Sequence, residues 1–552
     1  MRTSRGDYVI WDTSIRLRNI KMNRSVSSQA AYAILFLAVV QFILQVSLLA
    51  RGEEYVAASL MIDDTYYYLQ TAWNTRQLGF VTFDGLHATN GVQLAWFLLT
   101  LLLALLVQTK SALLFATLLT TFLLNALCYF FIFKIGTAVK RPALALLMAG
   151  LWSLQSLPFR IYSMGMENSL HALVFWCVVW QATVFLLRVQ SGLRPNFWSL
   201  TAILILNAWT RLDSALLSAT VYTFCLLAFA SSYRNNIRLF LERQRKAIVG
   251  TVLFATTGFI LQLGAFWLMG GSFLPVSALV KSSGASRHLP WESAGKLIEV
   301  LLLGMPSIVQ GRLPAAALAL FGLVGILVVL RARISGDGSR AWNAILALWS
   351  YLLVGELLYH TFVGVSGVQY TPYFIWYRSP SFVFWILTAS LAVLSVLDKA
   401  RQIEALSRAA RWAPAALSFA LFATAIYMFA RSSNFTSQLY VARYQAALWI
   451  ADNAPPDTVF AAWNTGQLGY FSDRTFINLD GVINSVDYYQ RILRGATPLA
   501  DYLAENNVDY IVDYAIYAPI PDFPVVHTFP ISEESERSIH IWQVSAQSST
   551  AR

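Results

Sequence analysis

Apolar runs of membrane-spanning length recur along most of the chain and constrain its fold more than any other feature of the sequence. The first extends from about residue 30 to residue 50, and others follow as far as about residue 430. A soluble domain cannot bury so many such runs. The composition agrees, because 57% of the 552 residues are hydrophobic and only 12% are charged. The sequence therefore predicts a polytopic α-helical membrane protein.

Clusters of Lys and Arg between the runs predict how the chain crosses the membrane. Basic residues in short loops favour the cytoplasmic side, and one assignment places every major cluster there. It has the N-terminus inside, the C-terminus outside and about eleven spans, at residues 30–50, 111–133, 142–158, 169–187, 197–210, 214–232, 247–270, 313–330, 341–360, 379–397 and 412–430. We expect the runs at 93–108 and 296–310 to be interfacial helices, because a crossing at 93–108 would put basic clusters outside.

The residues after the last span differ in composition from the rest of the chain. Residues 431–552 contain 7 Lys and Arg against 13 Asp and Glu, whereas residues 1–430 contain 33 against 16. Membrane topology explains this split, so no nucleic-acid partner is needed. We expect a basic cytoplasmic N-terminus at 1–29, a membrane domain at 30–430 and a small extracytoplasmic α/β domain at 431–552. Its predicted helices cover 442–453 and 487–494, and its predicted strands cover 458–463, 475–479, 509–514 and 539–544.

The cysteines and the absence of repeats exclude some classes of protein. Cys128, Cys177 and Cys225 all lie in apolar runs, which excludes a disulfide framework and a CxxC metal site. No internal repeat is present, so the inverted-repeat architecture of many secondary transporters has no support.

The stretch from Met61 to Leu78, MIDDTYYYLQTAWNTRQL, is the first candidate for function. Asp63 and Asp64 open a predicted amphipathic helix that is rich in aromatic residues. Both acids could serve only to cap this helix and favour its dipole. Alternatively, Asp64 caps it and leaves Asp63 free to point at a substrate.

Further polar residues fall in the predicted outer loops, where ionisable groups close to a membrane suggest function. Carboxylates there suit a general base, and Arg or Lys suits a phosphate. Each residue also has a plainer explanation: a helix cap for Glu167, mutual pairing for Arg211 and Asp213, and anchoring at lipid headgroups for the other cations. His87 and His171 fit hydrogen-bonding roles better than metal binding, because no HxxH spacing is present. The residues are His87, Asn90, Glu167, His171, Arg211, Asp213, Lys281, Arg287, Trp376, Tyr377 and Arg378.

These motifs, in this order, resemble those of the GT-C glycosyltransferases. DDTYYYLQTAWN followed by FDGLHATNG is similar to DDAYYYLRIARN and TNGYHPLW of bacterial members, and SMGMENSL is similar to SGMETALF. TRLDSALL resembles RPDALLL, and LGYFSDRTFINLDGVINS resembles the extracytoplasmic C-terminal domain of the same group. Two departures are that Gln93-Leu94-Ala95 replaces the His-Pro of the second motif and that Leu212 replaces the Pro of RPD.

The resemblance implies a GT-C-like fold and an inverting transfer of sugar from a polyprenyl-phosphate donor. The acceptor would be a glycan, lipid or protein, and the enzyme would lie among the lipids of the bacterial cytoplasmic (inner) membrane. A divalent metal, Mg or Mn, is left open, with Asp64 and Glu167 as its ligands. The implied roles are Asp63 as base, Asp64 as its helper, Glu167 as acceptor-orienting residue, Arg211, Arg378 and Lys281 at the donor phosphate, and His87, Asn90, His171 and Tyr377 at the substrates.

Two other functional classes fit the same composition. A transporter or flippase for lipid-linked sugars would predict charges inside the membrane and symmetric halves. A non-catalytic scaffold of the cell envelope would keep the C-terminal domain without needing Asp63, Glu167 and Arg211 together.

Overall fold

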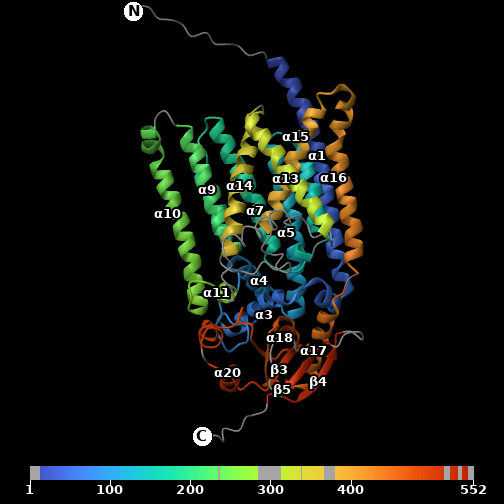
Figure 1. Ribbon diagram of the computed structural model, residues 1–552, viewed down its shortest axis with the longest axis vertical. Helices are drawn as coiled ribbons and strands as arrows, with labels where there is room; N and C mark the ends of the chain where they lie inside the picture. The colour runs from blue at the N-terminus through green and yellow to red at the C-terminus, as the bar shows by residue number, and fades with distance from the viewer. Residues whose placement is uncertain are drawn as a thin grey trace, which may run out of the picture.

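A computed structural model describes residues 13–158, 160–233, 237–283, 312–336, 338–365, 379–434, 436–495, 497–514, 523–531 and 537–544. These residues form a bundle of long helices with a small domain containing a β-sheet at one end (Figure 1). We call this end the domain end. The turn between α15 (Ser379–Ala400) and α16 (Glu404–Ser432), which carries a basic cluster, lies at the opposite end.

Every predicted span coincides with a helix of the bundle. Among the described residues, eight helices are long and apolar enough to cross a membrane, and three shorter apolar helices accompany them. The protein is therefore a multi-pass membrane protein with the predicted polytopic helical fold. Besides α15 and α16, the helices at the predicted spans are α1 (Thr13–Ser47), α5 (Lys110–Ala138), α6 (Pro142–Ser156), α7 (Asn168–Gln190), α8 (Phe197–Thr210), α9 (Ser214–Ser231), α10 (Ile237–Gly270), α13 (Arg312–Ser335) and α14 (Arg340–Val365).

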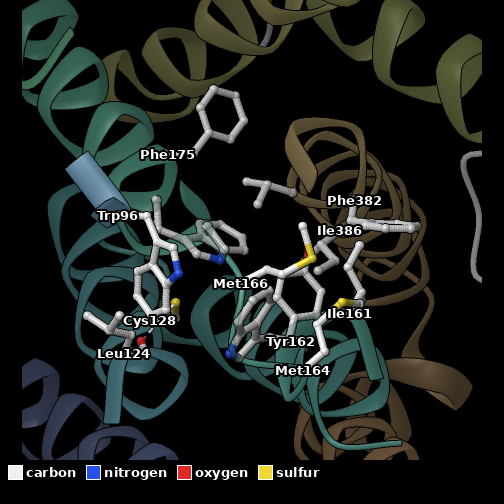
Figure 2. Packing of buried hydrophobic residues seen from close by; sticks show 14 of the residues in the cluster. Trp96, Leu124, Cys128, Ile161, Tyr162, Met164, Met166, Phe175, Phe382 and Ile386 are labelled. Carbon is white, nitrogen blue, oxygen red and sulfur yellow. Dashed lines mark hydrogen bonds between the residues drawn. The ribbon is translucent and has the colours of Figure 1, made fainter. Parts of the chain in front are cut away.

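Close packing between helices holds the bundle together. A Cβ atom on Gly150 of α6 would lie 2.7 Å from the Cα of Ser418 in α16, so the missing side chain lets the two helices approach closely. Large apolar side chains from separate segments converge in the core, as Figure 2 shows for Trp96, Tyr162 and Phe382. All three are buried, and contacts of this kind stabilise a bundle whose outer surface faces lipid.

Several short helices lie between the bundle and the sheet domain (Figure 1). They include α3 (Asp63–Leu78), α4 (Leu94–Leu106) and α11 (Val276–Ser283). Helix α3 ends at Gly79, whose φ of 79° is a left-handed conformation that suits glycine. Helix α4 is the predicted interfacial helix at 93–108, while the one predicted at 296–310 lies outside the described residues.

The C-terminal domain is a mixed α/β unit that begins with α17 (Gln438–Asn453). Its five strands have the order β2-β1-β3-β5-β4, in which β1 pairs parallel with β2 and β3, and β5 pairs antiparallel with β3 and β4. Four strands lie where the sequence predicts them, whereas β4 and the short helices α18 and α20 were not predicted. The strands are β1 (Val459–Ala462), β2 (Thr475–Asn478), β3 (Tyr510–Tyr514), β4 (Val525–Pro530) and β5 (Ser538–Gln543). The remaining helices are α18 (Gly466–Ser472), α19 (Val486–Tyr488), the π-helix η5 (Tyr489–Leu493) and α20 (Leu499–Glu505).

Candidate active site

Asp63 binds the C-terminal domain. Its buried carboxylate accepts hydrogen bonds from the backbone N–H groups of Gly466 (3.1 Å) and Gln467 (3.0 Å) at the start of α18. Arg443 of α17 lies 4.0 Å from the same carboxylate. Helix α3 itself has Ile62 at its N-cap and no capping side chain, so the prediction that Asp64 caps it and leaves Asp63 free is wrong. Asp63 instead satisfies the first N–H groups of a helix far along the chain.

Asp64 occupies a different environment from its neighbour. It is half-buried, and among the described residues it has no hydrogen bond or close ion pair. Its carboxyl has a pKa raised to about 6, mainly by burial, and the charges of Asp63 and Glu167 contribute to this increase. The charges of Lys281 and Arg443 act in the opposite direction and lower this pKa. A carboxylate with such a pKa is mostly ionised at neutral pH and is basic enough to accept a proton.

Asp480 brings a second half-buried carboxylate to the same place, from the loop after β2. It accepts a hydrogen bond from the hydroxyl of Tyr67 (3.4 Å) and another from the N–H of Val482 (2.8 Å). The pKa of Asp480 is raised to about 7, mainly by burial and in part by the charge of Asp64, whereas the N–H of Val482 and the charge of Lys281 lower it. The sequence analysis missed Asp480, although it lies in the run INLDGVINS that resembles other C-terminal domains.

Glu167, Arg211 and Asp213 form a buried network in which every charge is paired. Arg211 is 2% exposed and donates to Glu167 (2.6 Å) and, through two nitrogens, to Asp213 (3.1 and 2.9 Å). Tyr68 donates to the other oxygen of Glu167 (3.1 Å), and Tyr359 donates to Asp213 (2.8 Å). Pairing between Arg211 and Asp213 is thus confirmed. The alternative that Glu167 caps α7 is wrong, because its side chain makes no capping bond.

Three of the residues predicted to contact substrates, His87, Asn90 and His171, form hydrogen bonds within the protein. Asn90 is buried and donates to three backbone carbonyls between Phe266 and Leu274. His87 bonds to Asp84 (2.7 Å), a contact that raises its pKa, and His171 bonds to Ser214 (2.8 Å). Arg287, Trp376, Tyr377 and Arg378 lie outside the described residues.

The described residues do not fit a metal site around Asp64. No group of three or more His, Cys, Asp or Glu side chains with suitable geometry occurs in this part of the chain. Glu167 is the second metal ligand that the sequence analysis predicts. Each of its carboxylate oxygens already accepts a hydrogen bond, one from Arg211 and one from Tyr68.

Comparison with solved structures places this arrangement in a known fold. ArnT from Cupriavidus metallidurans bound to undecaprenyl phosphate superposes with a TM-score of 0.55 at 12% sequence identity, over 93% of this chain and 97% of that one. The chain has the ArnT fold. The apo structure of the same ArnT gives the same TM-score and identity, with 98% of its own length covered. The GT-C-like fold predicted from the motifs is thereby confirmed.

The sequence comparisons add one match. A family model described as a domain of unknown function (DUF8728) matches residues 433–548, which is the C-terminal α/β domain that supplies Gly466 and Asp480. No curated protein matches the chain by sequence.

Proposed function

We propose that the protein is a membrane glycosyltransferase that moves a sugar from a polyprenyl-phosphate donor to an acceptor hydroxyl. The observation that carries this proposal is Asp64, a half-buried carboxylate in an ArnT-like fold whose pKa is raised to about 6 and which lies in the electrostatic field of Lys281. A base of moderate pKa next to a cation is what displacement of a phosphate leaving group requires. The ArnT crystal structure with undecaprenyl phosphate supports a lipid phosphate as the donor group.

The proposed reaction is a single displacement at the anomeric carbon. Asp64 takes the proton of the acceptor hydroxyl, and the acceptor oxygen forms a bond to the anomeric carbon from the side opposite the phosphate. The bond between that carbon and the phosphate oxygen breaks, and its electron pair leaves with the lipid phosphate. Lys281 stabilises the negative charge that develops on this leaving group. The configuration at the anomeric carbon is inverted.

The geometry changes the roles of four residues in this proposal. Asp63 is committed to the N–H groups of α18, so we assign the base to Asp64 instead. Arg211 is buried between two carboxylates, which leaves it poorly placed to bind a phosphate. We therefore treat Glu167 and Arg211 as positioning residues. Arg378 stays a predicted phosphate ligand outside the described residues.

The proposed location is the bacterial inner membrane. With the basic clusters in the cytoplasm, the N-terminus lies inside and the domain end of the bundle faces the extracytoplasmic side. Asp64 and the C-terminal domain then meet the donor on that side.

The test is sugar transfer by purified full-length protein in nanodiscs, with wild type compared with Asp64→Asn. We expect the variant to fold normally and to lose about 10²- to 10⁴-fold in kcat, because a general base contributes that much. The matched control is Asp487→Asn, which removes an exposed carboxylate of the C-terminal domain. Unchanged kcat in Asp64→Asn would refute its role as base, and movement of intact lipid-linked sugar across vesicles without transfer would favour a flippase.

A further inference from the structure

The C-terminal domain contacts the first loop of the domain end through polar groups as well as apolar ones. Lys110 at the start of α5 pairs with Asp473 (2.6 Å), and the hydroxyl of Thr89 donates to the backbone carbonyl of Asn484 (2.8 Å). The ring of Tyr66 in α3 lies 5.4 Å from that of Tyr470 in α18. These contacts hold the domain in one position relative to α3.

Glycine at position 466 lets α18 of the C-terminal domain approach α3 more closely than any other residue type would allow. A Cβ atom at this position would collide with the backbone carbonyl oxygen of Asp63, so the position accepts only glycine without movement of α3 or α18. The hydrogen bond from the Gly466 N–H to Asp63 depends on the same close approach. The C-terminal domain therefore fixes the residue next to the candidate base.

Asp480 lies in the electrostatic field of Lys281, and the residues next to each of them pack together. Gly481 has a φ of 82°, and a Cβ atom there would lie 3.3 Å from the Cγ2 of Val280 in α11. This packing sets Asp480 beside the end of α11 that carries Lys281. The hydrogen bond from Tyr67 ties Asp480 to α3 on the other side, and Tyr67 lies one turn from Asp64. The charge of Lys281 lowers the pKa of both Asp64 and Asp480.

We propose that the C-terminal domain is a working part of the site, and that its Asp480 is the resident counter-ion of Lys281, which exchanges Asp480 for the phosphate of the lipid donor. This proposal rests on the proposed function, since it takes Lys281 as a phosphate ligand. Two anions that share one cation compete for it, so Asp480 weakens the binding of lipid phosphate. The same competition helps the product lipid phosphate to leave. It also gives the DUF8728 domain a chemical role.

The experiment measures binding of undecaprenyl phosphate to full-length protein in nanodiscs. Asp480→Asn keeps an acceptor oxygen for the N–H of Val482, places an amide NH₂ beside the hydroxyl of Tyr67, and removes the charge. We expect it to bind undecaprenyl phosphate about threefold to tenfold more tightly than wild type. A residue that only maintained structure would give weaker binding. Asp487→Asn, an exposed carboxylate of the same domain, should leave the affinity unchanged.

A double-mutant cycle identifies the cation. Lys281→Ala should weaken binding, and adding Asp480→Asn to it should have no further effect, because the shared partner is gone. Equal or weaker binding by Asp480→Asn in the wild-type background overturns the proposal, as does a wild type that does not bind undecaprenyl phosphate. If binding follows the expected cycle but no sugar is transferred, the proposed function fails and the role of Asp480 stands.

Discussion

Two groups of charged residues at the domain end differ in how completely their charges are paired. In the first, Arg211 is enclosed by Glu167 and Asp213. In the second, the charge of Lys281 acts on both Asp64 and Asp480, which nevertheless keep raised pKa values of about 6 and about 7. Both groups are acidic, and both contain a residue that the motifs singled out. From this difference we expect a motif residue with every bond satisfied to act as scaffold, and a carboxylate with few partners to be available for chemistry.

The largest effect on stability should come from removing Arg211, the cation at the centre of the paired group. Arg211→Ala leaves two buried carboxylates without their cation, which should lower the free energy of unfolding by about 3–5 kcal/mol. Chemical unfolding of the purified protein in detergent measures it. Arg141→Ala is the matched control, because it breaks an ion pair to Asp398 that is about one-third exposed and should cost less than about 1 kcal/mol. Equal losses in the two variants would contradict the contrast drawn above.

The raised pKa of Asp64 in the second group should make the rate of sugar transfer depend on pH. Only the ionised form of Asp64 accepts a proton, so kcat should rise with pH and level off above the apparent pKa of about 6. Below that value we expect a tenfold loss for each pH unit. Protein returned from pH 5 to pH 7 should regain full activity, which separates titration from unfolding. A flat profile between pH 5 and pH 7 would show that the base has an ordinary carboxyl pKa.

The smallest effect on stability should come from Tyr359, which lies at the edge of the paired group and donates to Asp213. Tyr359→Phe removes one donor from Asp213, which keeps both of its bonds to Arg211. We expect a loss of about 0.5–1.5 kcal/mol in the free energy of unfolding and little change in kcat. A loss as large as that of Arg211→Ala would mean that the network has no redundancy.

The helices and most strands could be predicted from sequence because their signals are local. Apolar runs and basic clusters located the spans, and alternation located four strands. The missed strand β4 lies at the edge of the sheet, exposes Val525 and Val526, and ends in Pro530, so its pattern differs from that of a buried strand.

The site was only partly predictable, because its decisive contacts join distant parts of the chain. The motifs located Asp63, Asp64, Glu167 and Arg211, but their roles depend on partners that no local pattern reveals. The amide that binds Asp63 belongs to a residue 403 positions later, and Asp480 is separated from α3 by the whole membrane domain. Spacing within a motif therefore could not decide which of two adjacent acids is engaged.

The contact between Asp63 and Gly466 also sets an order of events during biosynthesis. The ribosome makes the first loop early, yet the residue that completes it follows 403 positions later. At roughly 5–20 residues per second, α3 waits about 20–80 s for its partner. A chain that stalls or is cut before α18 has already inserted its helices but has no organised acidic pair. We therefore expect truncation before α18 to leave Asp63 without the two N–H groups that hold it in place.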